Sequence, residues 1–170
     1  MRELWFREFS PMSSATPPMR HFAKRIIVYE TRADKSAHSK TSTPFPVPEK
    51  LRPHLEQLMG DGGFRALLSR SLVLASAEVP WLRAVRVNSV GVLEGWEELS
   101  ASPRSNELFE ARVVLLAQLL GLLAAFIGEN LTLGLVHRVW PKVPLDGLGL
   151  FSAVNNGNSG VRNEKANQGI

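Results

Sequence analysis

"LLAQLLGLLAAFIGENLTLGLV", residues 115–136, is the longest apolar run of the chain and decides its class of fold. The uncharged stretch Val113–Gly128 is 16 residues long, whereas a membrane-spanning helix needs about 20 apolar residues. Extending the stretch would include Glu129, and an acidic group near the centre of a bilayer costs at least about 2.5 kcal/mol. A membrane anchor over 113–136 is therefore the alternative that we do not favour, and we expect the central helix of a soluble fold.

Projection of this run on a helix gives a broad apolar side and an opposite side of small and polar residues. The apolar side carries Leu115, Leu119, Leu122, Leu123, Phe126, Leu133 and Trp140. The opposite side carries Glu107, Gln118, Gly121, Ala125, Gly128, Glu129 and Thr132. We therefore predict a partly solvated helix of about 35 residues that ends before Pro141, with a kink near Gly121 or Gly128.

The small residues of this run form two small-xxx-small steps, which let another backbone approach closely. The candidate helix-packing residues are Ala117, Gly121, Ala124, Gly128 and Glu129. The spacing indicates either a helix crossing or a homodimer seam, and the alternative is a face that is simply less buried. Glu129 either pairs with an arginine such as Arg65 or Arg70, or is solvated.

Upstream of the run, the pattern predicts two more helices. The first begins near Pro48, with Leu51, Leu55, Leu58 and Met59 at helical spacing, and ends at Gly60. Asp61 caps the second, which Pro80 ends. Residues 84–94 then alternate around a turn and predict a short hairpin in which Val85 and Val87 face Val92 and Leu93.

The two ends of the chain have the composition of tails. Residues 1–47 are basic and rich in Pro, Ser and Thr, and residues 146–170 are polar and rich in Gly and Asn, so we expect both to be largely disordered. Within the first tail, "KRIIVYE" (24–30) is expected to dock as a lone strand or short helix. The sequence thus predicts a mainly all-α bundle over 48–145.

Charge is unevenly distributed along the chain. Residues 1–48 carry eight Lys and Arg against four Asp and Glu, whereas 49–142 carry ten against ten and 143–170 carry two against two. A neutral body argues against a nucleic-acid-binding domain, because such a domain usually shows its excess of positive charge on the folded surface. Weak nucleic-acid binding through the basic N-terminal tail stays an alternative.

No constellation of residues predicts catalysis. The chain has no cysteine, which excludes thiolate metal sites, disulfides and a cysteine nucleophile. It also contains no paired-histidine motif, calcium loop, P-loop or nucleophile elbow. We therefore predict no catalytic, metal or cofactor-binding residues. Trp81, Trp96, Trp140 and Phe126 are expected to anchor the core, and the alternative for Trp81 and Trp96 is a contact hot spot.

The segments "GGFRALLSRSL" and "FIGENLTLGLVHRVWP" resemble stretches of bacterial helical hypothetical proteins of similar size. This resemblance covers about residues 46–145 and implies a bacterial, cytoplasmic setting, but no activity, cofactor or partner comes with it. The absence of a catalytic constellation and the small-residue spacing lead us to expect a non-enzymatic protein that interacts with itself or with a protein partner.

Overall fold

The computed structural model describes residues 15–36, 45–100 and 105–145, and in these ranges the chain is mostly helical. Its elements are α1 (Pro17–Ser36), α2 (Val47–Glu78), the 3-10 helix η1 (Pro80–Ala84), β1 (Arg86–Val87), β2 (Leu93–Glu94), α3 (Trp96–Ser100), α4 (Ser105–Ile127) and α5 (Glu129–Val139). The predicted all-α class with one short hairpin is confirmed. The predicted C-terminal tail, 146–170, lies outside the described residues.

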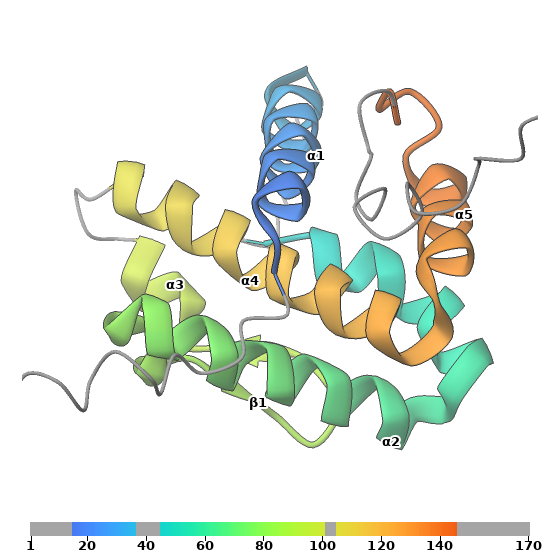
Figure 1. Ribbon diagram of the computed structural model, residues 1–170. Helices are drawn as coiled ribbons and strands as arrows, with labels where there is room; N and C mark the ends of the chain where they lie inside the picture. The colour runs from blue at the N-terminus through green and yellow to red at the C-terminus, as the bar shows by residue number, and fades with distance from the viewer. Residues whose placement is uncertain (1–14, 37–44, 101–104, 146–170) are drawn as a thin grey trace, which may run out of the picture.

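Helix α4 lies at the centre of the fold and contacts α1, α2, α3 and α5. Figure 1 shows it running across the molecule, with α1 crossing over it and α2 along its other side. All eight residues from Val113 to Leu120 are buried. The prediction of a solvated side is therefore wrong for this part of the helix. Gln118, on that side, is fully buried and donates a hydrogen bond from Nε2 to Oε1 of Glu78, at 2.5 Å.

Helix α1 covers α4 from a part of the chain that was predicted to be a tail. The prediction for 1–47 is wrong for Pro17–Ser36, and its remaining parts, 1–14 and 37–44, lie outside the described residues. The buried residues of α1 recur at helical spacing: Met19, Phe22, Ala23, Ile26 and Ile27. The folded domain therefore begins at α1 rather than at residue 48.

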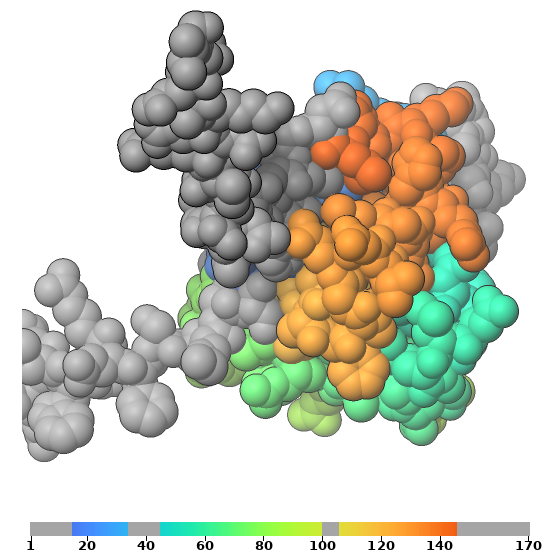
Figure 2. All heavy atoms as spheres, turned by 45° about the vertical axis from the view of Figure 1, so that its right-hand side comes forward, coloured from blue at the N-terminus to red at the C-terminus, as the bar shows by residue number. Residues whose placement is uncertain are grey.

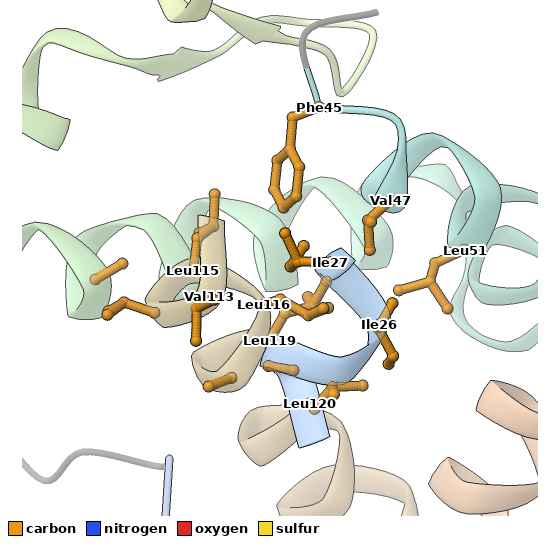
Figure 3. Close-up of a cluster of buried hydrophobic side chains, with 14 of the residues drawn as sticks. Ile26, Ile27, Phe45, Val47, Leu51, Val113, Leu115, Leu116, Leu119 and Leu120 are labelled. Carbon is orange, nitrogen blue, oxygen red and sulfur yellow. The ribbon is translucent and has the colours of Figure 1, made fainter. Parts of the chain in front are cut away.

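The core forms where these helices meet. Figure 3 shows Ile26 and Ile27 of α1 next to leucines of α4, with the start of α2 closing the cluster. The other labelled residues are Val113, Leu115, Leu116, Leu119 and Leu120 of α4, Val47 and Leu51 of α2, and Phe45 just before α2. The stripe that begins at Met19 thus includes the isoleucines of "KRIIVYE", which belong to a helix and not to a strand.

Helix α2 is bent at Gly60, as the sequence predicted. Gly60 has φ 74° and ψ 168°, a conformation that glycine adopts at little cost, and the chain is helical on both sides of it. The helix begins at Val47, with Pro48 in its first turn. The predicted boundary between two helical segments at residues 60 and 61 is therefore confirmed.

A sharper break separates α4 from α5. Gly128 has φ 87° and ψ 158°, which ends α4 and starts α5 in a new direction. Its carbonyl accepts hydrogen bonds from the backbone N–H of Thr132 at 3.1 Å and from its Oγ1 at 2.8 Å. Of the two predicted kink positions, Gly128 is correct and Gly121 lies within the uninterrupted α4. The predicted single helix is thus two helices.

The hairpin pairs Arg86 with Glu94 and Val87 with Leu93, so the predicted pairing of Val87 is confirmed. Val85 precedes the strand and is buried instead. The turn is held against α2 by Arg52, whose Nη2 donates to the carbonyl of Gly91 at 2.7 Å. The hairpin is therefore an extension of the α2 surface and not a separate layer.

A buried carboxylate joins α1, α2 and the end of α5. Glu30 is only 3% exposed, and its two oxygens accept from Nε1 of Trp140 and Nζ of Lys50, each at 2.5 Å. Both oxygens of this charged group therefore have a donor, as burial of a carboxylate requires. The contact fixes the segment after α5 against α1.

Candidate interaction surface

The predicted small-residue stripe lies largely inside the protein. Ala117 is fully buried and Gly121 is buried too, so no second copy of the chain can reach them. Ala124 is half-buried, and Gly128 is exposed at the break between the helices. The five predicted residues therefore do not form one continuous outer surface.

Ala124 and Glu129 line a small space of about 10 Å³ together with Met19 and Phe22 of α1. This part of the stripe thus faces another helix of the same chain. The predicted partner Arg65 lies elsewhere, where its Nη1 donates to the carbonyl of Ser89 at 2.7 Å. Among the described residues, Glu129 forms no ion pair with an arginine, and it lies in the first turn of α5, where the helix dipole favours its charge.

Large apolar side chains are exposed at the corner where α4 meets α5. Phe126 is 73% exposed and Leu131 is 65% exposed, and Leu58 on the neighbouring part of α2 is 58% exposed. The prediction of Phe126 as a core anchor is wrong, because the chain turns away at Gly128 before another helix can cover the ring. Trp96 and Trp140 are each 2% exposed and do anchor the core, while Trp81 is half-buried.

A groove of about 260 Å³ runs between α5 and the first part of α2 at this corner. Its apolar lining consists of Leu58, Ile127, Leu131 and Leu135. Its polar lining consists of His54, Gln57, Asn130 and Arg138. Figure 2 shows this face, where the orange residues of α4 and α5 lie against the teal residues of α2. An apolar hollow with polar groups around it is typical of a surface that receives another protein.

The sequence contained one signal for this surface. Leu131 and Leu135 are four residues apart and share one face of a helix, whereas Leu133 points to the opposite face. Two opposite faces of α5 are therefore apolar, and a neighbouring helix on one side leaves the other face open. The partner wall of the groove, with Leu58, was not predictable, because Leu58 also fits the apolar stripe of its own helix.

The described residues offer no site for a metal ion. In the ranges 15–36, 45–100 and 105–145, no group of three or more His, Asp or Glu side chains is placed to hold one. Asn106–Ile127 has the length and a mean hydropathy, 1.9, that would allow it to cross a membrane. However, 61% of its apolar window is buried inside the fold, as in the core helix of a soluble bundle.

Comparison with known proteins does not assign a function. Protein-family models, curated proteins and solved structures were compared with this chain, and none of them matches. The resemblance to bacterial hypothetical proteins therefore stays a prediction. The groove between α2 and α5 is the feature of the described residues that suggests a function.

Proposed function

We propose that this protein is a non-enzymatic helical interaction protein that associates with a second copy of itself through the groove between α2 and α5. The observation that carries the proposal is the exposure of Leu131 and Leu58, which line the groove, together with the exposed Phe126, which precedes Ile127 of the groove lining. Single exposed apolar residues are common on protein surfaces, whereas a contiguous group that surrounds a hollow indicates a binding surface.

The occupant that fits this face is a second copy, because the face has both a projecting and a receiving part. Phe126 projects next to Ile127, which lines the groove. In a two-fold interface each copy presents the same patch, so the ring of one copy can enter the groove of the other and the reverse. Two equivalent contacts form at once, which a one-sided partner would not provide.

Burial of these side chains supplies the driving force. Moving a Leu or Phe side chain from water into an apolar contact is worth about 1.5–3 kcal/mol. A charge introduced at the centre of such a contact removes this gain and adds the cost of an unpaired buried charge, so we expect the affinity to fall by at least about tenfold. The fold itself tolerates the charge, because Leu131 is mostly exposed in the single chain.

The test is sedimentation velocity of the full chain over a wide range of concentrations. We expect a concentration-dependent shift from monomer to dimer, which Leu131→Glu and Leu58→Glu abolish. Val73→Glu is the matched control, since Val73 is 63% exposed and lies in the other half of α2, away from the groove. A monomer at every concentration, or equal weakening by all three variants, would contradict the proposal.

A further inference from the structure

A second surface, separate from the α2–α5 groove, is formed by the outer face of α1. A cleft of about 490 Å³ lies between this face and the segment that follows α5. Its basic lining consists of His21, Lys24, Arg25, Arg32 and Lys142, and its remaining lining consists of Val28, Tyr29, Val143 and Pro144. Among the residues that the structure describes, no acidic side chain lines this cleft.

The basic residues of α1 lie along one side of the helix. His21, Arg25 and Arg32 are separated by four and seven residues, which places them in one row opposite the buried Ala23. Arg25 and Arg32 also have interactions of their own within the protein. Lys24 and Lys142 are the exposed cations of the cleft, and Nζ of Lys24 also lies 5.8 Å from the centroid of the Phe109 ring.

The two walls of the cleft are fixed relative to each other. Glu30, the carboxylate of α1 nearest to the cleft residues in sequence, points into the core and accepts from Trp140. The backbone N–H of Val143 donates to the carbonyl of Trp140 at 3.1 Å, and Val143 is buried. Lys142 is thus anchored opposite α1, and the nearest carboxylate is withdrawn from the cleft surface.

The position of α1 in the folded domain alters the conclusion drawn from the positive charge of residues 1–48. The excess of positive charge in residues 1–48 was expected on a disordered tail, which argued against a nucleic-acid-binding body. Because α1 is part of the folded domain, a share of that charge lies on a rigid surface. Tyr29 lines the cleft together with the basic side chains. An aromatic ring beside basic side chains is typical of surfaces that bind single-stranded nucleic acid, where bases stack on the ring and phosphates pair with the positive charges.

We infer that the cleft between α1 and residues 142–144 binds the backbone of single-stranded nucleic acid. Each phosphate that pairs with a lysine or arginine releases bound counterions, so binding weakens as salt rises. For three phosphate contacts, the affinity is expected to fall about 20-fold between about 50 and 200 mM salt. Loss of one contact lowers it about fivefold at about 0.1 M salt.

The test is fluorescence anisotropy of labelled oligothymidine and oligouridine with the full chain at several salt concentrations. We expect salt-dependent binding that Lys24→Gln and Lys142→Gln each weaken about fivefold at about 0.1 M salt. Arg83→Gln is the matched control, because it removes the same charge from an exposed position on η1. The Arg83→Gln variant should bind the oligonucleotides with the same affinity as the unchanged protein.

Several results would overturn the inference. Absence of binding to either oligonucleotide would overturn it. Equal weakening of binding by all three variants would also overturn it, because binding would then depend on net charge alone. Binding that neither lysine variant changes would place the contact outside the cleft. Tighter binding to duplex than to single strands would contradict the single-strand assignment. Association of the full chain with anionic phosphatidylserine vesicles, without nucleic-acid binding, would favour a membrane surface instead.

Discussion

The two parts of the apolar run, α4 and the corner that leads into α5, have similar composition and opposite environments. Residues 113–120 are buried on all sides, whereas Phe126 and Leu131 are mostly exposed. The difference lies in what covers them, because α1 and α2 pack on the middle of α4, while neither helix covers Phe126 and Leu131 at the turn around Gly128. An apolar sequence therefore shows that a segment can be buried. Whether it is buried within its own chain depends on the elements that pack around it.

The largest expected effect separates these two environments directly. Leu119→Ala leaves a cavity among α1, α2 and α4, and we expect it to lower the free energy of unfolding by about 3 kcal/mol. Leu131→Ala, the same change at the exposed corner, should lower it by about 0.5 kcal/mol or less. Urea denaturation at low protein concentration, where the chain is monomeric, measures both. Equal losses would mean that the two leucines have similar environments.

The next largest effect on stability is expected at the C-terminal end of α5, where Trp140 is buried in the core. Trp140→Phe keeps the aromatic packing but removes the donor to the buried Glu30 carboxylate. We expect a loss of about 1–3 kcal/mol in the free energy of unfolding, because a buried charged acceptor is left without one of its partners. Thermal denaturation followed by circular dichroism checks this. Val73→Ala, at an exposed position away from the groove, serves as its control, and a loss no larger than that of the control would contradict the assigned contact.

Two glycines sharpen the boundary between the regions. Gly128 has a conformation that other residues avoid, so Gly128→Ala is expected to destabilise the fold by about 1–3 kcal/mol although nothing lies within 4 Å of the added carbon. Gly134 lies inside α5 with equally open surroundings, and Gly134→Ala should stabilise it by about 0.5–1 kcal/mol. Chemical denaturation distinguishes the two, and effects of the same sign would show that Gly128 does not set the break.

Much of this architecture was predictable from local signals. The all-α class, the bend at Gly60, the pairing of Val87 in the hairpin and one of the two proposed kink sites, Gly128, follow from periodicity and glycine placement. These features depend on residues within a few positions of each other. A short stretch of sequence is therefore enough to predict each of them.

The parts that could not be predicted depend on long-range packing. The buried stripe of α1 was hidden by the prolines and basic residues around it, and without α1 the side of α4 that carries Gln118 looks solvated. For the same reason the small residues Ala117 and Gly121 suggested an outer seam. Exposure of Leu131 and the wall of the groove that carries Leu58 depend on where α2 lies, which no local pattern specifies.

The central claim is that α1 belongs to the folded domain and is the reason why residues 113–120 of α4 are buried on every side. Native-state amide hydrogen exchange of the full chain tests it most directly. We predict that the amides of Ile26 and Ile27 are protected nearly as strongly as those of Leu116 and Leu119, because these residues share one core. Exchange of the α1 amides at the rate of an unstructured peptide, with α4 still protected, would contradict the account.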